Sequence, residues 1–374
     1  MIGFGSAVAK AVAKAVDKAV DKAVDKAVDK AVDNRPMAPR VTMSEVAKVA
    51  GVSVMTVSNV VNGHRYVSDA TRDRVLEAID RLGYRVNVAA RNLRSGSTGI
   101  IGLAVPDIDA PYFGQLAALL TRRATRLGYQ IVVEQTGATR ESELSALTHS
   151  RLRMYDGLII STVGLGNEDA EQLRSEFPVV ALGERITGAG ALDHVAMANV
   201  AGAQDATRHL IERGCRRIAV LGGSLDAGVN AGSLRTAGYR RALVEAGLPW
   251  REELVLEQAF TLAGGAAGVR ALVGAGIAFD GLVCMTDMLA LGALRALADH
   301  GLEVPGDVRV IGFDDIEQAA YSVPSLSTIA PGHSEMADAA LRLLTERIAG
   351  RRDESAFEEF VGPHRLVVRE STGG

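Results

Sequence analysis

The sequence predicts an α/β protein with a small all-α unit at its N-terminus, followed by two lobes built on parallel sheets. Residues 41–82 carry short apolar segments at helical spacing. From Gly99 onward, apolar runs of strand length alternate with longer helical patterns, which is typical of parallel strands covered by helices. At 374 residues the chain is too long for one ordinary hydrophobic core, so we expect two or three domains.

Residues 41–62 predict two short amphipathic helices. The first is expected to begin after Ser44, whose hydroxyl is a suitable N-cap, and to end at Gly51. The second is expected to begin at Ser53, another capping residue. Apolar residues at helical spacing predict the buried faces of the two helices: Val46, Ala47, Val49 and Ala50 in the first, and Val57, Val60 and Val61 in the second.

A third helix is needed, because two helices this short cannot fold alone. Ser68 and Asp69 are expected to open it, and Gly83 to stop it. The apolar residues that would close the core recur on one face of this helix: Val75, Leu76, Ile79 and Leu82. The result is a three-helix unit with a helix-turn-helix at its front.

The exposed face of the second helix carries side chains that suit a DNA major groove. Asn59 can hydrogen-bond an adenine edge, and Val54 and Met55 can lie against thymine methyl groups. Thr56, Ser58 and Asn62 flank them, with polar groups that suit phosphates. A small helical bundle with a polar face is the alternative. Residues 37–96 hold nine Lys and Arg against five Asp and Glu, in a chain of net charge −4, and this local basicity favours DNA binding.

The composition argues against several other classes of protein. Hydrophobic residues make up 48% of the chain, yet no run approaches the roughly 20 apolar residues that span a bilayer, and no secretory signal is recognisable. We therefore expect no membrane contact and a cytoplasmic, nucleoid-associated protein. Cys215 and Cys284 are expected to be buried free thiols rather than a disulfide or a zinc site. The seven histidines are scattered, and we expect no metal and no cofactor.

Residues 7–34 repeat a four-residue unit, AVAK or AVDK, that ends as AVDN. Valines four apart drift by about 40° per unit around an α-helix, so they form no lasting apolar seam. We interpret residues 1–36 as a low-complexity appendage, which a start codon placed upstream of Met37 would explain. An additional DNA-binding arm and an interaction rod are the alternatives.

The second part of the chain predicts two similar lobes. Strand-like runs occur at 99–105, 130–135, 157–162 and 178–183, and a second series occurs at 217–223, 254–260, 281–287 and 308–315. The chain is expected to cross between the lobes near 195–200 and again near 325–330. Ligands of such sheets bind beyond the carboxyl ends of the strands, so residues just after these runs are candidates for a binding cleft.

Sugars need charged or amide partners for their hydroxyls and an aromatic surface for their C–H face. The residues of these types that follow the strands predict an effector site: Tyr112, Phe113, Arg235, Asp287 and Asp314. Each also has a structural interpretation. Tyr112 could belong to a lobe core, Asp287 could cap the following helix, and Asp315 could cap a turn.

The sequence argues against an enzyme. Asp314 and Asp315 are adjacent at a strand end and point in opposite directions, so they do not form a facing acid/base pair. The Gly-rich segment 263–276 lacks the spacing of a dinucleotide-binding loop, and close helix packing is the preferred interpretation. The sequence shows no nucleophile elbow and no P-loop motif.

Five segments of the chain carry a family pattern: VTMSEVAKVAGVSVMTVSNVVN, VSDATRDRVLEAIDRLGY, NVAARNLR, RTAGYRRAL and VIGFDDIEQAAYSVPSLSTI. They resemble the lactose-repressor (LacI/GalR) family of bacterial transcription regulators. The resemblance covers nearly everything from about residue 40 onward. It implies a helix-turn-helix DNA-binding domain at 37–84, a hinge helix at 85–97, and a two-lobed core at 98–374 that is similar to periplasmic sugar-binding proteins. Only the tail, residues 1–36, lies outside it.

The resemblance also implies roles for individual residues. Leu93 corresponds to the leucine that the family inserts between base pairs in the minor groove, with a packing role as the alternative. Phe113, Arg235 and Asp314 correspond to effector contacts. Two residues depart from the family pattern. Val86 stands where the family usually has proline, and Ala198 stands where it often has aspartate. The set expected at the DNA is Thr42, Ser53, Val54, Met55, Thr56, Ser58, Asn59, Asn62, Tyr66, Tyr84, Asn87 and Leu93.

The function that this resemblance implies is a homodimeric repressor, which binds palindromic operator DNA and responds to a small sugar-like effector. The chain ends without a leucine heptad, so a tetramer joined by a coiled coil is not expected. The alternative is a sugar-binding protein of a transport or sensing system without a gene-regulatory role. That protein would need a secretory signal and would have no DNA-binding domain.

Overall fold

The computed structural model describes most of the 374-residue chain. The described residues are 41–61, 66–85, 96–151, 154–169, 173, 177–184, 186, 192–226, 228–353 and 356–374. They form two compact units, one within Met1–Arg91 and one within Asn92–Gly374. The tail 1–36 lies outside the described residues, and so do Asn62, Val86, Asn87 and Leu93.

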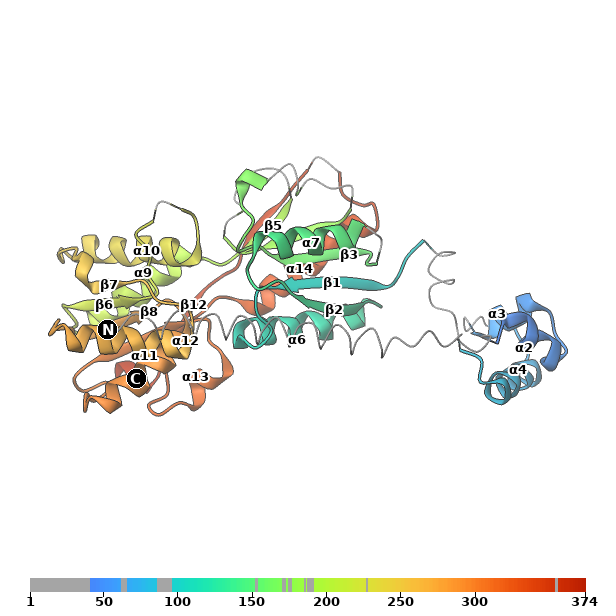
Figure 1. The fold of residues 1–374 in the computed structure, drawn as a ribbon, viewed down its shortest axis with the longest axis horizontal. Coiled ribbons are helices and arrows are strands. Elements are labelled where there is room, and N and C mark those ends of the chain that lie inside the picture. Colours follow the sequence, from blue (N-terminus) through green and yellow to red (C-terminus); the bar gives the residue numbers. More distant parts are fainter. Residues whose placement is uncertain are drawn as a thin grey trace, which may run out of the picture. The chain divides into compact units, whose positions relative to one another are not determined.

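The first unit, which we call the headpiece (residues 41–85), contains the three predicted helices. They are α2 (Met43–Ala50), α3 (Val54–Val61) and α4 (Asp69–Leu82) (Figure 1). Helix α2 begins earlier than predicted, and its N-cap is Thr42 rather than Ser44. Thr42 and Glu45 form a capping box, in which Glu45 N donates to Thr42 Oγ1 at 3.3 Å and Thr42 N donates to Glu45 Oε2 at 2.7 Å.

The headpiece core confirms most of the predicted apolar face. Val46, Val57 and Val75 are fully buried, one from each helix. Val49 and Leu76 are exposed, which corrects their assignment to the core, and the smaller Ala78 is buried instead. Gly51 and Gly83 end their helices in the left-handed conformation, as predicted, with φ of 64° and 61°.

The second unit, the core, consists of two lobes, each built around a six-stranded sheet. The strands of the first lobe are β1 (Ile100–Val105), β2 (Gln130–Gln135), β3 (Gly157–Ser161), β4 (Val179–Leu182), β5 (Asp193–Ala196) and β11 (Glu359–Val361). They lie in the order β11-β5-β4-β3-β1-β2, and all pair in parallel. The helices of this lobe are α6 (Pro111–Arg126), α7 (Arg140–Arg151) and α14 (His333–Ile348).

The second lobe repeats this arrangement. Its strands are β6 (Ile218–Leu221), β7 (Val255–Leu256), β8 (Gly281–Cys284), β9 (Arg309–Phe313), β10 (Ser327–Ala330) and β12 (Arg365–Val367), in the order β12-β10-β9-β8-β6-β7. Among the described strands of this lobe, β12 alone pairs antiparallel, with β10. The helices are α9 (Asn199–Glu212), α10 (Ala231–Glu245), α11 (Leu262–Gly274), α12 (Asp287–Asp299) and α13 (Glu317–Tyr321). The two sheets with covering helices confirm the predicted fold class.

The chain crosses between the lobes three times, and only two crossings were predicted. The first lies between β5 and α9, the second between β10 and α14, and the third between β11 and β12 (Figure 1). The last two crossings touch. Gly332 has a φ of 73°, and a Cβ there would lie 2.5 Å from Pro363 O, so only glycine lets these segments approach so closely.

Small residues control helix packing in the second lobe. A Cβ at Gly265 of α11 would lie 2.0 Å from Leu289 O of α12, and a Cβ at Gly292 of α12 would lie 2.0 Å from Leu262 O. This contact confirms that the Gly-rich segment serves helix packing. Cys215 and Cys284 are buried free thiols, as predicted. None of the described helices combines the length and apolar character needed to cross a membrane.

Candidate functional site

A cavity of about 600 Å³ lies between the two lobes of the core. The first lobe contributes residues that follow β1, β3 and β4, and the second contributes the N-terminal ends of α10 and α12 and the residues that follow β9. The walls therefore form at the carboxyl ends of parallel strands, where the sequence predicted a ligand site. Four of the five predicted effector residues line this cavity: Tyr112, Phe113, Arg235 and Asp314.

Two aromatic residues from the start of α6 form one wall. Tyr112 and Phe113 contact each other edge to face, with ring centroids 4.9 Å apart. Burial raises the pKa of the Tyr112 phenol, and the nearby carboxylates of Glu184 and Asp314 raise it further. The hydroxyl therefore stays protonated at neutral pH and can donate a hydrogen bond to a ligand. Phe260 adds a third aromatic side chain from the second lobe.

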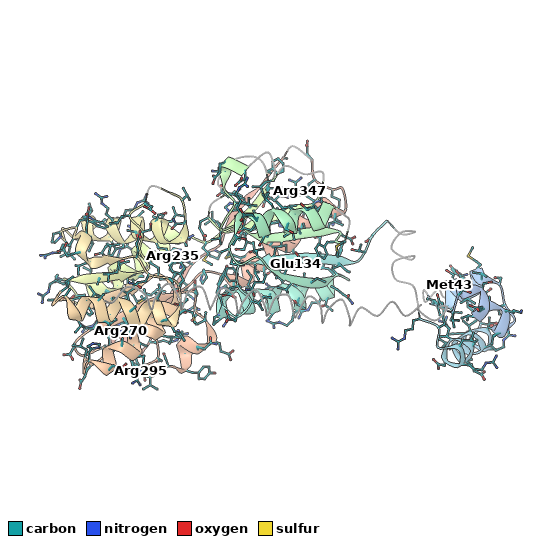
Figure 2. All side chains as sticks on the ribbon, in the orientation of Figure 1. Met43, Glu134, Arg235, Arg270, Arg295 and Arg347 are labelled. Carbon is teal, nitrogen blue, oxygen red and sulfur yellow. The ribbon has the colours of Figure 1, made fainter. Side chains whose placement is uncertain are left out.

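Arg235, labelled in Figure 2, is the positive charge in the wall, and only 3% of its surface is exposed. Its Nε donates to Asn199 Oδ1 at 2.7 Å, one terminal nitrogen donates to Met285 O, and the other lies 3.3 Å from the sulfur of Met197. The guanidinium stacks on Phe313, 3.7 Å from the ring centroid. These contacts orient the group and leave it little freedom to move.

Asp314 faces Arg235 across a gap of 3.8 Å between Oδ1 and Nη1. Burial raises the pKa of Asp314 to about 7, because Arg235 offsets only part of the desolvation penalty and Glu184 adds a like charge. The residue has a φ of 119°, outside the ordinary region for a residue with a side chain. An unusual backbone conformation thus places a carboxyl group with a raised pKa in the cavity wall.

Asp287 does not line the cavity, which corrects the prediction that it contacts the effector. Its side chain is completely buried, and its oxygens accept hydrogen bonds from Thr328 Oγ1 at 2.6 Å and from Ile316 N at 2.9 Å. The N-cap of α12 is Thr286, so Asp287 is the first helical residue instead of the cap. Asp315 is also structural, since it pairs with Arg369 at 2.7 Å.

Several residues of the cavity wall were not predicted from the sequence. Glu184 follows β4 and accepts a hydrogen bond from Asn199 Nδ2 at 3.0 Å. Thr162 follows β3, and its buried Oγ1 has no hydrogen-bond partner among the described residues. Both stand at strand ends, so the rule that selected Asp314 could have found them. Asn199 gave no such signal, because it does not line the cavity itself. It hydrogen-bonds Glu184 and Arg235, which do.

The loop after β3 is held by a buried carboxylate. Glu143 of α7 is fully buried and accepts hydrogen bonds from the backbone N–H groups of Val163, Gly164 and Leu165, at 2.9, 2.9 and 2.8 Å. Three charge-assisted bonds fix a loop that places Thr162 and Val163 at the cavity. No sequence motif indicated this role.

The headpiece presents the predicted DNA-reading face on α3. Met55 is 70% exposed, Val54 is 47% exposed, and Asn59 is partly exposed. Tyr66 is fully exposed. Ser53 is confirmed as the capping residue, because its Oγ accepts from Thr56 N at 3.1 Å and lies 2.9 Å from Thr56 Oγ1. Thr42, Ser53 and Thr56 thus use their hydroxyls to fix the starts of α2 and α3.

Two residues predicted at the DNA are buried in the headpiece. Ser58 and Tyr84 are each only 8% exposed, and Tyr84 belongs to the apolar core. Contact of these two residues with DNA stays a prediction, and only their hydroxyl ends could make it. Burial also raises the pKa of the Tyr84 phenol. Asn62, Asn87 and Leu93 lie outside the described residues.

Comparison with known proteins matches both units. The family described as "Bacterial regulatory proteins, lacI family" matches residues 42–87, and the "Periplasmic binding protein-like domain" matches residues 207–372. The chain is 33% identical to catabolite control protein A of Priestia megaterium, over 89% of this chain and 99% of that protein.

Solved structures agree with this match. The CelR regulator in complex with cellobiose is 31% identical, with a TM-score of 0.66 and coverage of 89% of this chain and 100% of that one. The lac repressor dimer bound to operator has a TM-score of 0.77 at 27% identity, with coverage of 89% and 99%. The similarity thus extends over both units of this chain and over nearly the whole length of these relatives. This chain belongs to the LacI family of bacterial transcription regulators.

Proposed function

We propose that this protein is a cytoplasmic, nucleoid-associated repressor that binds palindromic operator DNA as a homodimer. Binding of a sugar-like effector in the cavity either lowers or raises its affinity for the operator. The observation that carries the proposal is the cavity itself. Aromatic side chains, a fixed guanidinium and a carboxyl group meet between two lobes, in a chain that also carries a DNA-reading helix. Similarity to the CelR–cellobiose complex supports a sugar as the effector class.

The proposed DNA contacts follow from exposure and chemistry. Val54 and Met55 would meet thymine methyl groups, Asn59 would pair with an adenine edge, and Tyr66 would reach the backbone. Thr42, Ser53 and Thr56 would bring the capped ends of α2 and α3 toward phosphates. Asn62, Asn87 and the minor-groove wedge Leu93 complete the proposed set, which belongs to a DNA-binding domain at 37–84 and a hinge helix at 85–97.

Control of DNA binding requires an effector that distinguishes two arrangements of the lobes. A ligand that contacts both walls stabilises the arrangement in which both sets of contacts are made. The free energy available for switching is the difference between its affinities for the two arrangements. The three crossing segments are the parts of the core that join the lobes and would transmit such a change.

Replacing Asp314 with Ala in the full-length protein tests this proposal. Operators are first selected from random DNA, and sugars that shift operator affinity are then identified by fluorescence anisotropy. We expect Asp314→Ala to retain operator binding and to lose the response to the sugar. Asp315→Ala is the matched control, because it removes a neighbouring carboxylate that lies outside the cavity wall. Loss of operator binding in Asp314→Ala would assign this residue a structural role only.

A transport or sensing protein without a regulatory role is the second candidate, but no observation favours it. It would share the two lobes and the cavity. It would not need the capped, exposed helix α3 or the basic segment that surrounds it. Failure to select any preferred DNA sequence with the full-length protein would support this alternative over a repressor.

A further inference from the structure

We propose that the effector is an uncharged, hydroxyl-rich molecule and that the cavity rejects phosphorylated sugars and other anions. This inference rests on the proposed function, because it names the class of effector that the same cavity accepts. Three observations support it: the net negative charge of the cavity wall, the contacts that Arg235 already makes, and the capping of the helix N-termini at the cavity.

The described residues of the cavity wall carry more negative than positive charge. Asp107, Glu184 and Asp314 face a single cation, Arg235. Asp107 is exposed, so solvent screens it, whereas Asp314 is 6% exposed and Glu184 is partly buried. A phosphate or carboxylate on a ligand would therefore meet like charges inside a partly enclosed space, where charge repulsion is weakly screened and lowers the affinity.

Arg235 has little capacity left to compensate a ligand anion. Three of its five N–H groups contact Asn199 Oδ1, Met285 O and the sulfur of Met197, and the carboxylate of Asp314 lies within ion-pairing distance of Nη1. A ligand anion that approached the terminal nitrogens would therefore compete with the Asp314 carboxylate for the same guanidinium.

Helix N-termini are the other common anion sites, and four described ones reach the cavity, those of α6, α10, α11 and α12. Helix α6 begins with Pro111, which has no N–H to offer. In α10 the N-cap Asn230 already accepts from Ser233 N at 2.9 Å. In α12 the N-cap Thr286 accepts from Leu289 N at 3.3 Å, and the carboxylate of Asp287 lies in the first turn. In α11 the N-cap Thr261 accepts from Gly264 N at 3.0 Å. The caps of α10, α11 and α12 each occupy one backbone N–H and so reduce the attraction of these three helix ends for an anion, whereas Ala110 at the N-cap of α6 makes no side-chain cap hydrogen bond.

The groups that remain available suit hydroxyls. Carboxylates accept hydrogen bonds from ligand O–H groups, and the unpartnered Oγ1 of Thr162 can accept or donate one. Tyr112, Phe113 and Phe260 offer apolar ring surface for the C–H face of a sugar. A neutral polyol satisfies these groups without bringing a charge of the same sign as the wall.

Matched pairs of sugars test the inference with the full-length protein at pH 8, where Asp314, with a pKa of about 7, is mostly ionised. The probes are D-glucose with D-glucose 6-phosphate, and D-ribose with D-ribose 5-phosphate, together with cellobiose. Binding is measured by thermal shift and by calorimetry, and operator binding is measured in parallel. We expect stabilisation by neutral sugars, with the phosphorylated partner of a binding sugar at least about tenfold weaker.

A carboxylate variant and its control identify the cause of the discrimination. Glu184→Gln removes a negative charge from the cavity wall. It should reduce, several-fold, the gap in affinity between a neutral sugar and its phosphorylated partner. Asp109→Asn removes a carboxylate from the same region as Asp107 but outside the wall, and it should leave the gap unchanged. A phosphorylated sugar that binds as well as, or better than, its neutral partner would overturn the inference.

The outcomes also separate this inference from the proposed function. If no sugar of either kind binds while operator binding persists, the sugar class fails, and the inference fails with it, but the DNA-binding function stands. If phosphorylated sugars bind and shift operator affinity, the proposed function stands and the inference alone is wrong. If a gap is found but Glu184→Gln leaves it unchanged, the charge of the wall is not its cause, and the inference is overturned.

Discussion

The side-chain oxygen of Asn199 accepts a hydrogen bond from Nε of Arg235 at 2.7 Å. The amide nitrogen of the same side chain donates to Glu184 of the first lobe at 3.0 Å. Asn199 is the first residue of α9, directly after the chain crosses between the lobes. One amide therefore links a carboxylate of the first lobe to the guanidinium of the second, at the back of the cavity.

Replacing Asn199 with Ala should weaken effector binding about tenfold or more, because it removes hydrogen bonds to two charged partners, worth about 1.5–3 kcal/mol each. Calorimetry with an effector sugar gives the affinity, and thermal unfolding reports any loss of stability. Gln204→Ala is the control, since it removes a partly exposed amide from the same helix that hydrogen-bonds Glu245 and does not line the cavity. Equal effector affinity in the Asn199→Ala variant and the native protein would contradict a role for this link.

The raised pKa of Asp314 predicts that stability depends on pH. The folded protein holds this proton up to about pH 7, whereas the unfolded chain releases it near pH 4. Protonation therefore favours the folded state, and this contribution is lost as the pH rises through 7. Relative to Asp314→Asn, which cannot titrate, the native core should lose a few degrees of melting temperature between pH 5.5 and 8.5, at about 2–4 °C per kcal/mol. If the melting temperatures of the two proteins changed with pH in the same way, the raised pKa of Asp314 would be refuted.

Substitutions on α3 should change which operator bases are preferred. Asn59→Ala should relax selection for adenine at one position, at a cost of about 1–3 kcal/mol for the preferred sequence. Met55→Ala should do the same at a position where thymine is selected. Sequence selection followed by anisotropy measures both effects, and Leu76→Ala provides an exposed control on α4. A loss of affinity that is uniform across sequences would argue against base contacts by these residues.

The conformation of the loop after β3 should depend on the negative charge of Glu143, which accepts three backbone hydrogen bonds from it. Glu143→Gln keeps the shape of the side chain but can accept at only one oxygen, and its NH₂ group then faces backbone donors. We expect lower stability, by about 1–3 kcal/mol, and weaker effector binding. Glu141→Gln changes an exposed residue of the same helix and should behave like the native protein. Unchanged effector affinity in a destabilised Glu143→Gln protein would limit this residue to folding.

Deletion of residues 1–36 should leave operator affinity and its salt dependence unchanged. This segment holds six Lys and one Arg against five Asp, so it offers little net attraction to phosphates. Anisotropy titrations between 50 and 200 mM salt, roughly the range over which phosphate contacts are resolved, compare the two proteins. A shallower salt slope after the deletion would show that the segment contacts DNA.

Local signals determined the elements and part of the site. Apolar residues at helical spacing within each segment, among them Val46, Val57 and Val75, predicted the three helices, because helical periodicity depends only on nearby residues. Gly51 and Gly83 marked helix ends for the same reason, since their left-handed conformation is a local requirement. The strand runs predicted the sheets, and the rule for strand ends selected Arg235 and Asp314.

Other features needed the tertiary structure. The structure showed that Thr42 rather than Ser44 caps α2, because Glu45 completes a reciprocal pair with it, although the spacing Thr-x-x-Glu is a capping-box signature that the sequence already carried. The strands β5, β11 and β12 are only three or four residues long, so the third crossing gave no clear pattern.

Asp287 and Asp314 are the same amino acid at equivalent strand ends, and the sequence assigned both to the effector. The fold separates them: Asp287 is buried with both oxygens bonded to Thr328 and Ile316, and Asp314 is turned into the cavity by its φ of 119°. Periodicity and residue chemistry are encoded locally, so the sequence by itself determined the helices, the strands and the class of regulator. Which carboxylate meets the ligand depends on burial and on partners distant in the chain, and only the packed tertiary structure decides that.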